Sequence, residues 1–172
     1  MARACALPLI GAMIFGGAAT AATPVLTWDG AKRLGVQCLV DPDRTPDRRR
    51  LQAALCDRVR ALAADKAPIP VVLLAPGDPG LIAADTAVLL FHANIQPDAV
   101  QSSGQSSGTR GGSLLVFSLR VFRATAAPSE LFGAAPRATA LPGRGASPGS
   151  QFDAAVNAAL AETLPWRSRP EP

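Results

Sequence analysis

Two segments of alternating apolar residues flank a polar tract, and they constrain the fold more than any other feature. Residues 88–95 and residues 115–121 each carry an apolar side chain at every second position: Leu89, Phe91, Ala93 and Ile95, then Leu115, Phe117, Leu119 and Val121. A period of two predicts a strand with one buried face. Between them, residues 101–113 hold a tandem QSSG and several glycines, which cannot bury apolar surface. We therefore expect a hairpin with a long flexible loop at residues 101–113.

A strand, a helix and a short strand precede this hairpin. The first strand is predicted over residues 34–40, where apolar side chains alternate: Leu34, Val36, Cys38 and Val40. A helical stripe follows at Leu51, Leu55, Cys56, Val59, Leu62 and Ala63. Thr45 can cap the free amides of this helix and Pro46 suits its first position, so we expect it to end near Ala64. The apolar run at residues 71–75 predicts a buried strand, and the proline- and glycine-rich residues 76–80 predict a turn.

The last part of the chain combines a segment of low regularity with a helix. Residues 124–149 are rich in alanine, proline and glycine, with short edge pairing expected at residues 131–132 and 138–141. A helix is predicted from Ser150, with Asp153 as its capping-box partner. Its apolar stripe is Phe152, Val156, Leu160 and Leu164. We expect Trp166 to fold back against the core and residues 167–172 to form a disordered tail.

The order strand, helix, three strands, helix predicts one α+β domain over residues 23–166. Two helices would cover one face of a small mixed or antiparallel sheet. This order resembles small modules of bacterial envelope proteins of the TolB amino-terminal, CsgG and LpoB type. The resemblance spans roughly residues 34–166 and rests on element order, so it implies a fold and assigns no site residue. The chain lacks the lipobox of the lipoprotein members.

Residues 1–22 have the order of a secretory signal. Arg3 supplies the charged start, residues 7–15 the apolar core, and residues 19–21 the small residues that a signal peptidase needs. The alternative is an uncleaved anchor, but the apolar run is shorter than the roughly 20 residues that cross a bilayer. We expect cleavage after Ala21 or Ala22, and a periplasmic or secreted mature protein without a transmembrane segment.

Cleavage would remove Cys5 and leave Cys38 and Cys56 in an oxidising compartment. The strand places Cys38 on its apolar face, and the helix places Cys56 on its apolar stripe. Packing the stripe on the face brings both into one layer, which predicts a disulfide between them. The alternative is a pair of buried free thiols.

The sequence provides few of the residue patterns that catalysis or cofactor binding requires. His92 is the single histidine, so a multi-histidine metal site is excluded and no other cluster has ligand spacing. The glycine-rich segments match no phosphate-binding motif, so we expect no cofactor. A catalytic pair of His92 and Ser118 is possible on neighbouring strands, against a strand histidine on a partly exposed sheet face. Aromatic residues make up only 5% of the chain, which argues against nucleic-acid stacking despite the net charge of +4.

An arginine cluster lies at the start of the first helix, where positive charge is unfavourable. Arg44, Arg48, Arg49 and Arg50 lie near the positive end of the helix dipole. An anionic partner such as a lipid headgroup or an acidic polymer would reverse that cost. The alternative is a solvated arginine run neutralised by the neighbouring aspartates.

The sheet face turned away from the helices is unusually apolar for a solvated surface. It is predicted to present Val72, Leu74, Val88, Leu90, Val116 and Phe122, with His92, Asn94, Ser118 and Arg120 between them. If this face is uncovered, it implies dimerisation or a protein partner. The alternative is that residues 124–149 wrap over it. The sequence thus favours a non-catalytic interaction or assembly module of the bacterial cell envelope, with a small secreted hydrolase or ligand-binding protein as the alternative.

Overall fold

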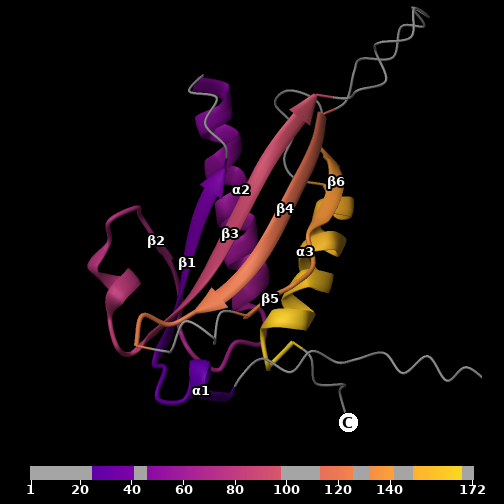
Figure 1. Ribbon diagram of the computed structural model, residues 1–172. Coiled ribbons are helices and arrows are strands. Elements are labelled where there is room, and N and C mark those ends of the chain that lie inside the picture. Colours follow the sequence, from indigo (N-terminus) through magenta and orange to yellow (C-terminus); the bar gives the residue numbers. More distant parts are fainter. Residues whose placement is uncertain (1–24, 41–45, 98–112, 126–131, 142–148, 168–172) are drawn as a thin grey trace, which may run out of the picture.

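The computed structural model describes residues 25–40, 46–97, 113–125, 132–141 and 149–167. The elements follow the chain in a simple order, with the predicted signal, the QSSG tract and residues 168–172 outside the described residues (Figure 1). Arg167, predicted to begin a disordered tail, instead pairs with Asp65 and donates to Asn157. They are α1 (Val25–Trp28), β1 (Arg33–Val40), α2 (Pro46–Ala64), β2 (Val71–Leu74), the 3-10 helix η1 (Pro79–Ile82), β3 (Thr86–Pro97), β4 (Ser113–Phe122), β5 (Phe132–Gly133), β6 (Arg137–Leu141) and α3 (Ser150–Thr163).

The six strands described form one mixed sheet. Its order is β2-β1-β3-β4-β5, and β6 also pairs with β4. β1 runs parallel to both β2 and β3, whereas β3 and β4 form the predicted antiparallel hairpin, with Leu89 opposite Val121 and Phe91 opposite Leu119. The connection from β1 through α2 to β2 is a strand–helix–strand unit, which is how parallel neighbours are joined.

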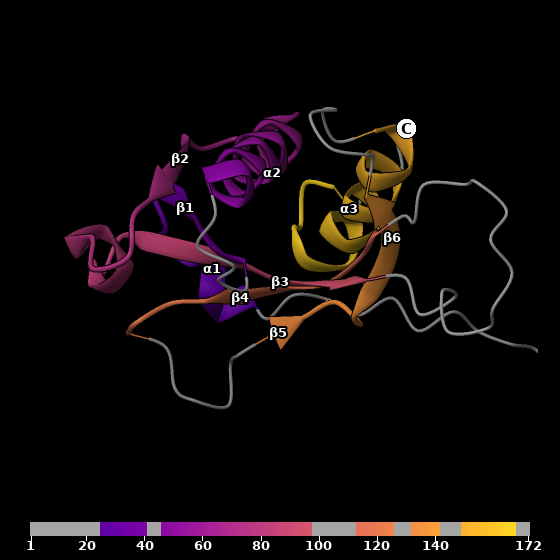
Figure 2. The same cartoon turned by 90° about the horizontal axis from the view of Figure 1, so that it is seen from above.

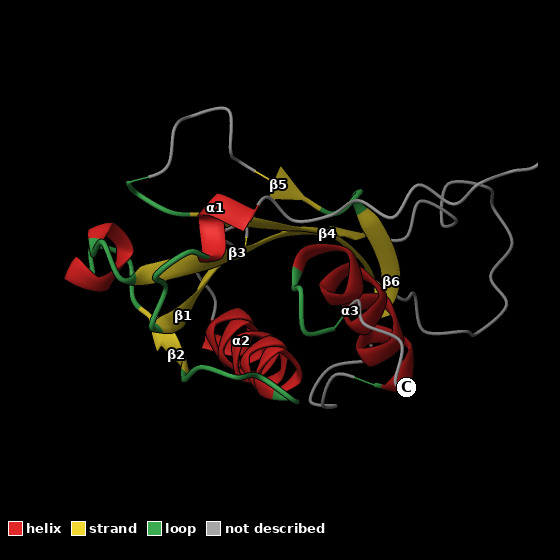
Figure 3. Ribbon diagram, turned by 90° about the horizontal axis from the view of Figure 1, so that it is seen from below, coloured by secondary structure: helices red, strands yellow, loops and turns green. Residues whose placement is uncertain are grey.

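Both long helices lie on one side of the sheet. Figures 2 and 3 show α2 and α3 side by side over the same face, and a bidentate pair between Arg58 and Asp153 joins them at 2.8 and 2.6 Å. The core lies between these layers. Its largest fully buried side chains include three mutually packed rings, Phe91, Phe117 and Phe152, whose centroids are 5.5 to 6.3 Å apart. The predicted α+β class with two helices on one face is confirmed.

The described part of the alanine-, proline- and glycine-rich segment extends the sheet. β5 pairs with the end of β4 at Arg120 and Val121, and β6 pairs with its start from Ser113 to Phe117. Residues 132–141 thus lie in the plane of the sheet, as the short edge pairing predicted. Residues 126–131 and 142–148 lie outside the described residues.

The sheet is closed at its lower end in Figure 1 by contacts between segments far apart in the chain. Trp166 returns to the core as predicted: its ring lies edge-on to Trp28, with centroids 5.0 Å apart, and its indole N–H donates to the carbonyl of Ala63 at 3.4 Å. Two short elements here, α1 and η1, were not predicted. Asp153 does not cap α3, whose N-cap is Gly149 without a side-chain cap, because its carboxylate binds Arg58 instead.

Candidate functional site: the open face of the sheet

The candidate site is the sheet face that points away from α2 and α3, called here the open face. The register fixes its members, because residues opposite each other on paired strands share a face. His92 lies opposite Ser118, Leu90 opposite Arg120, and Asn94 opposite Val116. The predicted partner-face residues Leu90, His92, Val116, Ser118, Arg120 and Phe122 therefore do gather on one face.

The middle of the open face is solvent-accessible and mixed in character. His92, Asn94 and Arg120 are exposed, and four residues between them are half-buried: Leu90, Val116, Ser118 and Phe122. Two apolar residues that the prediction missed add to it, Leu39 at 42% and Leu114 at 38% exposure. Extending the β4 alternation back by one step from Val116 would have found Leu114.

At one end the open face is covered by the chain itself. Val88 and Leu74, predicted to be part of an accessible partner face, are buried. Leu74 packs directly over Gly35, where an added Cβ would come within 2.2 Å of a Leu74 methyl, and it also contacts Gly80 of η1. Only glycine at position 35 lets this leucine reach the strand, so the segment between β2 and β3 seals this end.

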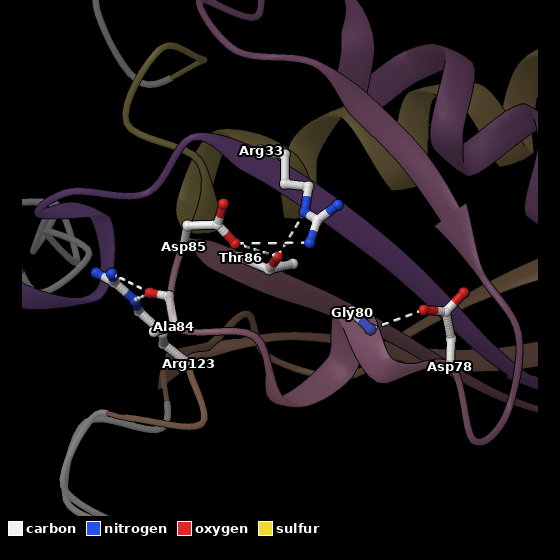
Figure 4. A network of polar contacts seen from close by, with 7 residues as sticks. All are labelled: Arg33, Asp78, Gly80, Ala84, Asp85, Thr86 and Arg123. Carbon is white, nitrogen blue, oxygen red and sulfur yellow. Dashed lines mark hydrogen bonds and ion pairs between the residues drawn. The ribbon is translucent and has the colours of Figure 1, made fainter.

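Polar contacts hold that covering segment in place (Figure 4). The guanidinium of Arg33 donates to Thr86 at 2.6 Å and pairs with Asp85 at 3.5 Å. Arg123, just after β4, donates to the carbonyl of Ala84 at 2.7 Å. These bonds order the covered end. In Figures 2 and 3, α1 lies on this side of the sheet, and Figure 1 places it at the lower end of the strands, away from the middle of the open face.

His92 and Ser118, the candidate catalytic pair, lie on the open face. The register makes them direct cross-strand neighbours, as predicted, with His92 exposed and Ser118 half-buried. Hydrolysis by such a pair also needs an orienting group for the histidine and donors for the oxyanion. The register places Leu39, Leu90, Asn94, Val116 and Arg120 around them, and of these Arg120 carries charge.

The arginine cluster is only partly within the described residues. Arg44 lies outside them, and the side chain of Arg48, in the first turn of α2, is not described. Arg49 and Arg50 are exposed on the same helix. The predicted anion or partner contact at this corner stays a prediction.

Cys38 and Cys56 meet as the sequence predicted, but in the structure they are free thiols rather than a disulfide. Both belong to the core, and the Cys38 thiol donates a hydrogen bond to the sulfur of Cys56. That bond, followed by burial, raises the pKa of Cys38 well above its ordinary value. Accepting the same bond lowers the pKa of Cys56. The predicted contact is confirmed, and the covalent bond stays a prediction.

Two further findings concern the described residues alone. They contain no group of three or more His, Cys, Asp or Glu side chains placed to hold a metal ion. None of their helices is both long and apolar enough to cross a membrane.

Comparisons with known proteins assign this chain to no family. No protein-family model and no curated protein matches the chain. Among solved structures, the PelC dodecamer from Paraburkholderia phytofirmans aligns with a TM-score of 0.49 at 9% identity, covering 78% of this chain and 88% of that one. A point variant of the same dodecamer gives a TM-score of 0.48 at 10% identity, covering 77% and 87%. A likeness of this size does not establish a shared fold or function.

Proposed function

We propose that the chain is a non-catalytic interaction or assembly module of the bacterial cell envelope, exported to the periplasm or secreted, whose contact surface is the open face. The observation that carries the proposal is the one-sided packing of the sheet. Two helices cover most of one face, while the other exposes Leu39 and Leu114 beside His92, Asn94 and Arg120. The export part rests on the signal-like residues 1–22.

The chemistry of the open face suits a protein partner, including a second copy of the chain. Its apolar side chains are spread over neighbouring strands with only one charged residue, Arg120, in the middle of the face. Fully buried centres of protein interfaces are depleted of charge and enriched in apolar residues and arginine. A polyanion or a nucleic acid would call for several cations, whereas among the described residues Arg120 alone is charged in the middle of this face.

The test compares the effect on binding of one substitution on the open face with that of a matched substitution on the helix layer. The chain from residue 23 onward, which holds every described residue, is compared with Leu114→Glu on the open face and Ala61→Glu on the exposed side of α2. Sedimentation velocity measures self-association, and retention of proteins from an envelope extract measures partner binding.

We expect Leu114→Glu to weaken association or retention at least tenfold and Ala61→Glu to leave both unchanged. A tenfold loss corresponds to about 1.4 kcal/mol, which is modest for burying a charge in an interface. Equal binding by all three chains contradicts the proposal.

A hydrolase remains the second candidate because His92 and Ser118 are cross-strand neighbours. It predicts that a serine-reactive fluorophosphonate labels Ser118 and that His92→Ala abolishes the labelling. Absence of labelling in the folded chain contradicts the hydrolase and leaves the interaction module in place.

A further inference from the structure

The thiol contact joins the two layers of the fold. Cys38 lies on the helix-facing side of β1, and Cys56 lies on α2 where that helix packs against the sheet. Each residue is 8% exposed, and the two sulfurs are in hydrogen-bonding contact although they lie 18 positions apart in the chain. A disulfide needs a sulfur–sulfur distance of about 2 Å, so the sulfurs would have to close by roughly 1–2 Å.

The contact between the two thiols and their burial both act on their acidity. Cys56 accepts the hydrogen bond, which lowers its pKa, while Cys38 donates it and has a raised pKa. Burial and the neighbouring carboxylate of Asp57 both oppose a thiolate at either position. Since thiolates are the nucleophiles in thiol–disulfide exchange, one of the two thiols must first lose its proton.

We propose that Cys38 and Cys56 form an oxidation site, which a disulfide-bearing oxidant closes to an intramolecular bond fastening α2 to β1. The thiolate of one cysteine attacks one sulfur of the oxidant disulfide, and the other sulfur of the oxidant leaves as a thiol. The second cysteine then loses its proton and attacks the sulfur of the first, which releases the second oxidant thiol. Two electrons and two protons pass from the protein thiols to the oxidant disulfide. That this happens to the exported chain rests on the proposed function.

Folding should strongly favour this bond. The native packing already holds the two sulfurs together, whereas the unfolded chain must close a loop of about 19 residues to join them. The loop-closure entropy of such a loop corresponds to an equilibrium constant about 200-fold larger in the folded chain than in the unfolded one. By linkage, the oxidised chain is more resistant to denaturation by the same factor.

A glutathione redox titration tests the geometry directly. The chain from residue 23 onward contains no cysteines other than these two, so alkylation and mass spectrometry count the bond without ambiguity. The titration is run on the same chain under native conditions and in urea, which avoids dependence on a variant. Cys56→Ser is the control that can form no intramolecular bond.

We expect the folded chain to be oxidised at a glutathione ratio about 200-fold more reducing than the unfolded chain. The proposal is overturned if the folded chain needs a glutathione ratio as oxidising as the unfolded chain does, or a more oxidising one. Cells expressing the full chain are then quenched with acid and alkylated, which reports whether the two cysteines of the exported protein are thiols or a disulfide. Neither cysteine should react with the alkylating agent until a reductant is added. Free thiols in the exported protein overturn the oxidation site, and they leave the binding results for Leu114→Glu unaffected.

Discussion

Two adjacent leucines on β4, Leu114 and Leu115, differ in burial, so the same substitution at each position distinguishes the surface from the core. Leu115 is fully buried against the helix layer, whereas Leu114 is 38% exposed on the open face. Truncation to alanine removes the same atoms at both positions. At Leu115 it leaves a cavity in the core, for which we expect a loss of about 2–5 kcal/mol. At Leu114 water fills the space, and the loss should stay below about 1 kcal/mol.

Urea denaturation at low protein concentration measures the two free energies of unfolding on the monomer. For a domain of this size, about 1 kcal/mol shifts the thermal midpoint by roughly 3 °C, so Leu115→Ala should also melt about 6–15 °C lower. Equal losses for the two variants would refute the reasoning. That result would mean that Leu114 is packed within the monomer and that the open face is covered by its own chain.

Three further outcomes follow from the contacts. Pairing with Arg58 lowers the pKa of Asp153, so this pair stabilises the fold fully at neutral pH and no longer does so once the pH falls below the lowered pKa. Asp153→Asn should therefore lower the urea midpoint at neutral pH and leave it unchanged in acid. Gly35→Ala should cost about 1–3 kcal/mol because of Leu74, and a double-mutant cycle with Leu74→Ala should show the cost shrink. Trp166→Ala should cost about 2 kcal/mol by calorimetry, through loss of its ring contact and core packing.

Local patterns in the sequence predicted the elements well, because each pattern reports burial of its own residues. The alternation in β3 and β4 placed His92 and Ser118 on one face, and the stripe from Leu51 to Ala63 matched α2. Patterns of this kind show which side of a strand is buried and not which strand lies beside it. The central position of β1 between two parallel neighbours was therefore beyond them.

The prediction failed where a distant residue decides the outcome. Asp153 has the spacing of a helix cap, yet it binds Arg58, which lies 95 positions away. Val88 and Leu74 have the alternation of an accessible face, yet both are buried, and Leu74 packs between Gly35 and Gly80 of η1. In each case the competing partner comes from another element, and its placement follows from the packing of the whole domain.

The central claim is that the open face is the surface through which this protein meets its partner. A photoreactive amino acid placed at Leu114, with Ala61 on α2 as the matched position, tests it in cells that make the full chain. The account predicts a discrete cross-linked product from Leu114 and none from Ala61. Cross-linking from Ala61 alone, or from neither position, would contradict it.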